Sequence, residues 1–388
     1  MIKKKMWEVE SFVYEDPVSG RKVKKLTDYL GHSNHLYFTD PCWIKDNEVF
    51  IFTSDRENKS NLYSYDLNQS LITQLTYFEG KERPGGVYSQ SNQAHYFWYG
   101  NKLYELDINT LDLKLLYKVE KDGFTSRKTL DVTADGKYVC IVVHKDEGQK
   151  EPAISYAYSR FEELYEKRPL TRIIRLDIKT GKTEIIHEDN CYIGHLNASP
   201  TRSELFTFCH EGPWDRVSQR MWGLNVVEKK VWKLRPQEEN EAVGHEYWLQ
   251  DGERVGYHGR RIYEQKQDNE FFGVIKWDNT ENIEFDFPYH STHFHSNDEN
   301  IMVGDGSSAT GDMPYIMLFK KEKEEFVEPR VLAFHRSTFN DQHAHPHPRF
   351  TPDGNHVIYS SDLTSYSNIY IVETGDFYDL PTLKETLK

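Results

Sequence analysis

The sequence has few cysteines, and no two of them stand close together. Its 388 residues include four, Cys42, Cys140, Cys191 and Cys209, and none forms a Cys-x-x-Cys pair. Secreted domains held together by disulfides have dense, regularly spaced cysteines, which this chain lacks. A reduced chain in the cytoplasm is therefore the simplest interpretation.

The chain also lacks an excess of positive charge and any long apolar run. Its formal net charge of −14 argues against a nucleic-acid partner, because phosphates require a basic surface. The first eight residues carry positive charge, but no apolar segment follows them, so neither a signal peptide nor a membrane span is expected. An anionic substrate would need a locally basic pocket. Nothing in the sequence implies an obligate protein partner.

Aromatic residues, in contrast, are plentiful, and short strands recur along the chain. There are 25 tyrosines, 21 phenylalanines and 8 tryptophans, residue types that favour strands. In residues 46–76, a turn with Asp and Asn precedes an apolar strand, a strand ending near Asp-Leu and a more polar strand. Seven such units follow one another at a spacing of about forty to fifty residues. This repeat predicts an all-β fold, a seven-bladed β-propeller.

One domain is expected to span residues 1–388 and to close on itself. The seventh unit, which begins at 351–354, lacks a last strand. Segment 21–27 resembles the polar strand at 72–76, so we expect it to pair with the C-terminal blade. Such closure would remove two exposed sheet edges.

Segment 154–169 breaks the strand pattern. Phe161, Leu164 and Tyr165 fall on one face of a helix, and Glu163 lies four residues before a lysine with which it can pair. The segment therefore predicts a short helix inserted in the third blade, either as a packing element or as a lid.

Histidine is concentrated in the segment 342–348, Gln-His-Ala-His-Pro-His-Pro. Its prolines favour an extended backbone, in which side chains two residues apart point the same way. We therefore expect His343, His345 and His347 to share one face, unless the chain turns between them. Neutral imidazole is the commonest metal ligand in proteins and suits Mn, Fe, Co, Ni or Zn. From these residues alone, a metal site and a polar loop that is rich in histidine by chance both stay open.

Other histidines stand shortly before the turns that begin a repeat. In a propeller, the chain segments that enter the innermost strand of each blade converge on one mouth of the central channel. Residues just before these turns can therefore meet although they are far apart in sequence. This position is shared by His245, His293, His345 and His347. The agreement predicts one common site.

These motifs resemble those of the oligogalacturonate lyases of the pectin pathway, a seven-bladed propeller family with a manganese site. The matching stretches are His-Glu-Gly-Pro at 210–213, Arg-Met-Trp at 220–222, His-Glu-Tyr-Trp at 245–248, and the segments 292–306 and 342–352. The resemblance covers nearly the whole chain and is strongest from residue 205 onward. Before that point, only the repeat and scattered residues agree.

The resemblance implies a divalent metal, with Mn2+ as the first candidate. Its ligands would be His293, Gln342, His345 and His347. The resemblance also implies that His245 is the Brønsted base, that Arg220 stands beside it at the reacting sugar as a catalytic and substrate-binding residue, and that His210 belongs to the substrate pocket. His295 and His343 are additional histidines to which it assigns no ligand role.

The implied activity is β-elimination of short oligogalacturonides, chiefly digalacturonate, saturated or unsaturated, to products of the 5-keto-4-deoxyuronate type. The proton on C5 is α to a carboxylate and very weakly acidic, so negative charge builds on that carboxylate as the proton leaves. A metal cation with neutral ligands keeps its charge for an anionic substrate and stabilises it as a Lewis acid. Two alternatives stay open: a non-catalytic propeller of the TolB type, and a propeller hydrolase. A glycosidase would be built on carboxylates, and Glu211 and Glu246 are the acids inside the motifs.

Overall fold

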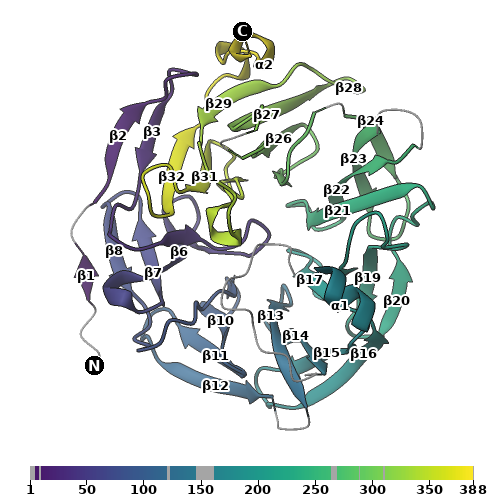
Figure 1. Cartoon of the computed structure of the whole chain (residues 1–388). Coiled ribbons are helices and arrows are strands. Elements are labelled where there is room, and N and C mark those ends of the chain that lie inside the picture. The colour runs from purple at the N-terminus through teal and green to yellow at the C-terminus, as the bar shows by residue number, and fades with distance from the viewer. Residues whose placement is uncertain are drawn as a thin grey trace. The chain divides into compact units, whose positions relative to one another are not determined.

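The strands of the described residues form seven antiparallel sheets (Figure 1). The computed structural model describes residues 5–7, 10–119, 123–145, 161–263, 269–287, 289–308 and 311–387. The chain divides into two compact units. One unit consists of Met1–Phe38, Cys42–Gly85 and Tyr289–Lys388, and the other of Thr39–Pro41 and Gly86–Pro288.

The unit built mainly from Gly86–Pro288 contains the second to fifth sheets, each with four strands in chain order. The second sheet consists of β9 (Val87–Ser89), β10 (Ala94–Tyr99), β11 (Lys102–Asp107) and β12 (Leu113–Lys118). The third consists of β13 (Phe124–Val132), β14 (Tyr138–Lys145), β15 (Leu170–Asp177) and β16 (Thr183–Asn190). The fourth consists of β17 (Ile193–Ala198), β18 (Leu205–His210), β19 (Met221–Asn225) and β20 (Lys230–Lys233). The fifth consists of β21 (Glu241–Trp248), β22 (Arg254–Arg261), β23 (Asn269–Lys276) and β24 (Ile283–Asp286).

The other unit contains the first, sixth and seventh sheets. The first consists of β4 (Ser33–His35), β5 (Trp43–Lys45), β6 (Val49–Ser54), β7 (Asn61–Asp66) and β8 (Leu71–Gln74), with β1 (Met6–Trp7) at its edge. The sixth consists of β25 (Phe294–His295), β26 (Ile301–Gly304), β27 (Tyr315–Glu322), β28 (Glu325–Phe326) and β29 (Arg330–Phe334). The seventh consists of β30 (Arg349–Phe350), β31 (His356–Ser361), β32 (Asn368–Glu373), β3 (Lys22–Lys25) and β2 (Phe12–Glu15). Short helices are η1 (Arg56–Asn58), η2 (Gln342–Ala344), η3 (Phe377–Asp379) and α2 (Leu383–Thr386).

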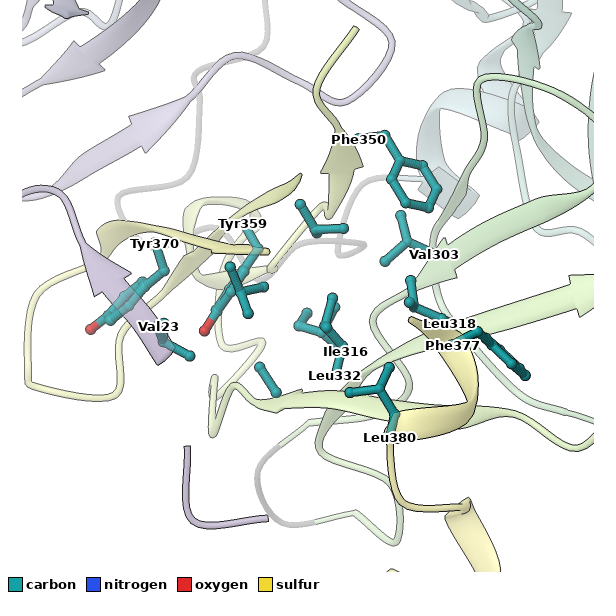
Figure 2. Close-up of a cluster of buried hydrophobic side chains, with 13 residues drawn as sticks. Val23, Val303, Ile316, Leu318, Leu332, Phe350, Tyr359, Tyr370, Phe377 and Leu380 are labelled. Atoms are coloured by element: carbon teal, nitrogen blue, oxygen red, sulfur yellow. The ribbon is translucent and has the colours of Figure 1, made fainter. Parts of the chain in front are cut away.

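The seventh sheet combines strands from both ends of the chain. Strand β3 pairs with β32, so that Val23 lies opposite Val372 and the purple and yellow strands stand side by side (Figure 1). Val23 is fully buried, whereas Lys22 before it is exposed, as expected for a strand with one face in the core. Figure 2 shows Val23 in the same buried cluster as Tyr359 and Tyr370. This pairing agrees with the expectation that segment 21–27 pairs with the C-terminal blade. The organisation of residues 1–388 as one domain stays a prediction.

The inserted helix, α1 (Phe161–Lys167), lies between β14 and β15 of the third sheet. Residues 154–160 of the predicted insertion lie outside the described residues. The hydroxyl of Tyr165 donates a hydrogen bond of 2.7 Å to the carbonyl of Arg216. The predicted fold class is confirmed: the chain is an all-β, seven-bladed propeller with a short helix in the third blade. In the described part of the chain, no helix is long and apolar enough to cross a membrane.

Candidate functional site

A tight turn shapes the histidine-rich segment before β30. The carboxylate of Asp341 accepts hydrogen bonds from the backbone N–H groups of His343 and Ala344 and so begins the short helix η2. After the turn, His345 returns to an extended conformation. The chain thus turns between His343 and His345, which is the exception stated for an extended segment, and His343 does not join the group that contains His345 and His347.

Three imidazoles meet in the unit that contains the sixth and seventh sheets. His293, His345 and His347 each offer a ring nitrogen, and these nitrogens lie within 4.8 Å of one another. The ring centroid of His293 is 4.2 Å from that of His347 and 5.4 Å from that of His345. All three side chains are buried. His347 has a φ of +45°, a strained conformation of the kind found at functional sites.

Gln342 lies at the edge of this triad. Its Nε2 is 3.0 Å from Nε2 of His347. The oxygen and nitrogen of a side-chain amide have nearly the same shape, so a rotation of the amide by half a turn would present the oxygen at this point instead. The structure therefore brings together all of the predicted ligands, one from the segment before β25 and three from the segment before β30.

A buried carboxylate orients the first of these imidazoles. Oδ2 of Asp305 is 2.6 Å from Nδ1 of His293, and Oδ1 accepts the backbone N–H of His293 at 2.8 Å. Burial alone would raise the pKa of Asp305, but its interaction with His293 outweighs burial and keeps the pKa below its usual value. Since an ionised carboxylate only accepts, Nδ1 of His293 carries a hydrogen, and Nε2 is the ring nitrogen that can face a metal. Metal-ligating histidines commonly have such a partner.

The other two imidazoles are held in the neutral form. Burial, assisted by His293, lowers the pKa of His345 to about 4. Burial, assisted by His293 and His345, lowers the pKa of His347 well below its usual range. A neutral imidazole keeps a lone pair for a metal. Three imidazole nitrogens and an amide oxygen form a donor set that suits a divalent transition metal, so the residues present fit the implied cofactor.

The remaining two histidines of these segments face elsewhere. Nδ1 of His295 accepts the backbone N–H of Phe350 at 3.2 Å, which ties the ring to β30. The carbonyl of His343 accepts hydrogen bonds from Asn34 and Ser367. Neither imidazole belongs to the triad.

The position of Asp305 leads to a first testable expectation. Asp305→Asn should weaken metal binding by about 10- to 100-fold, because an amide holds the tautomer and orientation of His293 less firmly than a carboxylate. Titration of metal-free protein with Mn2+ in a calorimeter measures this change. Asp298→Asn, an exposed aspartate in the turn before β26, is the matched control and should bind as the unmodified protein does. Equal affinity of both variants would contradict the proposed role of Asp305.

The unit that contains the second to fifth sheets holds a second group of polar residues around Arg220. This arginine is buried, its Nε donates to Oε2 of Glu246 at 3.1 Å, and its Nη2 is 2.7 Å from Oε1 of Glu211. Burial alone would lower the pKa of Arg220, but Glu211 and further neighbours raise it well above its usual value. Arg220 is therefore a permanent cation and cannot serve as a base. Its guanidinium lies 5.7 Å from the ring of Trp214.

His245 occupies a bulge in β21. The register between β21 and β22 shifts between Gly244 and Tyr247, and His245 has a φ of +50°. A bulge redirects a side chain, and a residue other than glycine in this backbone region is strained. Nδ1 of His245 is 3.2 Å from Nε2 of His258. The side chain of His245 is buried, and its ring lies 5.1 Å from that of Trp214.

His195 has the equivalent position in the fourth sheet, and sequence reasoning gave it no role. The register of β17 shifts between Gly194 and Leu196, and His195 has a φ of +34°. Its ring nitrogens are 3.8 Å from Glu211 and 3.8 Å from Glu246. The signal that could have revealed it is the dipeptide Gly-His, which occurs at 31–32, 194–195 and 244–245 and stands at a register shift in the last two places.

His210 ends β18 and lines a cavity of about 290 Å3. Its Nε2 is 3.6 Å from Oδ2 of Asp189, and its ring lies 4.7 Å from that of Trp222. Burial lowers the pKa of His210 to about 4. Glu211, which is paired with Arg220, lines the same cavity. The expectation that His245 and the imidazole triad form one common site stays a prediction.

Comparisons with known proteins agree with the motifs. The family model described as oligogalacturonate lyase matches residues 1–377. An oligogalacturonide lyase of Pectobacterium atrosepticum is 30% identical over 94% of this chain and 96% of its own length. An oligogalacturonate lyase of Dickeya dadantii is 29% identical over 97% of this chain and 99% of its own length.

A solved structure agrees over the full length as well. The structure of an oligogalacturonate lyase in complex with manganese matches this chain with a TM-score of 0.86 and 27% identity, and the match covers 100% of both chains. The resemblance seen in the sequence is thus confirmed by a family model, by curated relatives and by a fold. The chain belongs to the oligogalacturonate lyase family.

Proposed function

We propose that this protein is a metal-dependent lyase that cleaves short oligogalacturonides, chiefly digalacturonate, by β-elimination. The observation that carries the proposal is the buried triad of His293, His345 and His347, with Gln342 beside it, in a chain of this family. The manganese in the related structure supports Mn2+ as the cofactor. The four cysteines are free thiols, which supports a reducing compartment such as the cytoplasm.

The proposed ligands are His293, Gln342, His345 and His347. When bound, a divalent cation supplies a Lewis acid that stabilises negative charge on the carboxylate of a uronate. The residues themselves contribute neutral donors only, so no protein carboxylate in the ligand set cancels the charge of the cation. In a chain of net charge −14, such a set offers the local positive charge that an anionic sugar requires.

We assign the role of Brønsted base to His245. In the proposed reaction its imidazole takes the proton from C5, the released electron pair forms the double bond between C4 and C5, and the bond from C4 to the bridging oxygen breaks. The leaving oxygen then takes a proton from water. The assignment is supported by the burial of this imidazole and by its strained backbone, a conformation that is common at functional sites.

Arg220 and His210 are proposed to contact the substrate. Nη1 of Arg220 is buried and has no hydrogen-bond acceptor among the described residues, so it can donate to a sugar oxygen or carboxylate. His210 lines the cavity beside Glu211 and Trp222, where a neutral imidazole and an indole can contact a sugar.

Glu211, one of the two acids inside the motifs, does not have the environment of the general acid of a glycosidase. Such an enzyme needs one carboxylic acid with a raised pKa. Glu211 has the opposite environment: burial would raise its pKa, but the charges of Arg220 and His195 outweigh burial and lower it. A pure binding module, the other alternative, has no need of a buried triad of neutral imidazoles.

Analysis of the products by mass spectrometry tests the proposal. β-Elimination adds no water, so the two products of digalacturonate should together have the mass of the substrate. Cleavage should stop when a chelator removes the metal and resume when Mn2+ is added. Two products that together weigh one water more would identify a hydrolase. A metal-loaded protein that binds the disaccharide without cleaving it would identify a binding module.

A further inference from the structure

His258 makes a close contact with the proposed base. It lies in β22 directly opposite Gly244, and the bulge in β21 places the next residue, His245, beside it. The two rings are nearly parallel, with centroids 5.4 Å apart and an angle of 18° between their planes. Nδ1 of His245 and Nε2 of His258 are 3.2 Å apart, within hydrogen-bonding distance. Both side chains are buried.

A third ring fixes this pair. Trp214 meets His245 and His258 edge to face, at centroid distances of 5.1 Å and 5.5 Å and an angle of 72° in each case. The indole also covers Gly244, where an added Cβ would lie 2.3 Å from the ring. The glycine is therefore required for this packing, in which the indole contacts both imidazoles.

The hydrogen between the two nitrogens can belong to either ring, and the choice decides whether His245 can act as a base. If Nε2 of His258 donates, Nδ1 of His245 accepts and the proton of a neutral His245 must sit on Nε2. If Nδ1 of His245 donates, its Nε2 carries the lone pair. Only the second arrangement lets Nε2 of His245 accept a proton from the substrate.

We propose that His258 is a positioning residue that accepts the Nδ1–H of His245 and so keeps the lone pair of the base on Nε2. This inference rests on the proposed role of His245. Once His245 has taken a proton it carries positive charge, and its hydrogen bond to the neutral His258 becomes charge-assisted and stronger. An interaction that strengthens as the proton is transferred accelerates the reaction, whereas one of constant strength does not.

Other charged groups stand near this pair and bear on its pH dependence. The ring of His195 lies 6.1 Å from that of His245, and its nitrogens face Glu211 and Glu246. Both carboxylates are paired with Arg220. Variants at His258 leave these groups in place, so a change in the pH profile of such a variant reports on the contact between the two imidazoles.

The test compares His258→Phe and His258→Gln in the full-length, metal-loaded protein. Phenylalanine keeps a ring against Trp214 but has no acceptor, and we expect kcat to fall by about 10- to 100-fold with KM changed by less than about twofold. Glutamine offers an oxygen near the position of Nε2 and should recover part of the loss. In His258→Phe, the acid limb of kcat/KM should move to lower pH, because protonated His245 has lost its acceptor. Metal content should not change.

His356→Phe is the matched control. This half-buried histidine begins β31, and the same replacement there should leave kcat and the pH profile unchanged. Unchanged kcat in His258→Phe would overturn the inference. The inference would also be overturned if His258→Gln were no more active than His258→Phe while both variants melt as the parent does.

If His258→Phe does not fold, the turnover of His258→Ala is measured with and without added imidazole. Restoration of turnover by imidazole supports the role of His258, and no restoration overturns it. Full turnover of a His245 variant would instead show that the proposed base is wrong.

Discussion

Replacing His345 or His347 by alanine is expected to remove the metal and the activity together. Each supplies one of three buried imidazole nitrogens that lie within 4.8 Å of one another, so its loss leaves two. Metal content should fall by at least about tenfold in each variant, and kcat by about 100-fold or more, the usual loss when charge stabilisation is removed. Elemental analysis of the purified variants and turnover of digalacturonate measure the two effects.

His295→Ala and His343→Ala are the matched controls, because each stands two residues from a proposed ligand. The ring of His295 is tied to the backbone of Phe350, and His343 lies in the turn capped by Asp341. Both variants should keep their metal. If they lose it while His345→Ala and His347→Ala do not, the ligand register is displaced by two residues.

The fold could be predicted because its information is local and repeated. Each blade is a meander whose strands are neighbours in sequence, so the spacing of turns and apolar runs determines the topology. The pairing of β3 with β32 joins residues 23 and 372, and it was foreseeable because the last repeat lacked a strand that an N-terminal segment could supply. The absence of a strand from the last repeat thus helped to predict which segment of the chain pairs with it.

The histidine-rich segment was predicted less well because two local preferences compete in it. Prolines favour an extended chain after Ala344, whereas the carboxylate of Asp341 caps a turn just before it. The turn removes His343 from the face of His345 and His347. An aspartate directly before the segment was the available signal, since a short polar side chain at that position commonly begins a helical turn.

The surroundings of His245 could not be predicted from spacing. The contact between His245 and His258 depends on a bulge that shifts the strand register. Trp214, whose ring contacts both imidazoles, lies in a loop after β18. Cross-strand partners of this kind are set by register, and register at a bulge is not visible in an alternating pattern. The Gly-His dipeptide stands at both bulges, at His195 and at His245, but it also occurs at 31–32 directly before β4, where no register shift follows.

His245→Asn should lose about 100- to 10,000-fold in kcat, the usual contribution of a general base, and should keep its metal. Asparagine tolerates the backbone φ of +50° at this position better than most residues and has an amide that cannot take a proton at neutral pH. The variant therefore removes the base with little change to the bulge. Since His245 is not one of the imidazoles of the ligand triad, the metal should be retained.

Three measurements together decide the assignment of the base. Turnover should fall as stated, and metal content should match that of the parent. The melting temperature should stay within a few degrees because asparagine tolerates the backbone φ of this position. A substrate labelled with deuterium at C5 should react more slowly than the unlabelled sugar in the parent, since that bond breaks in the proposed step. If His245→Asn keeps near-parental turnover, the base lies elsewhere. His195 and His210 then become the candidates, and Arg220 does not, because the carboxylates around it hold its pKa well above its usual value.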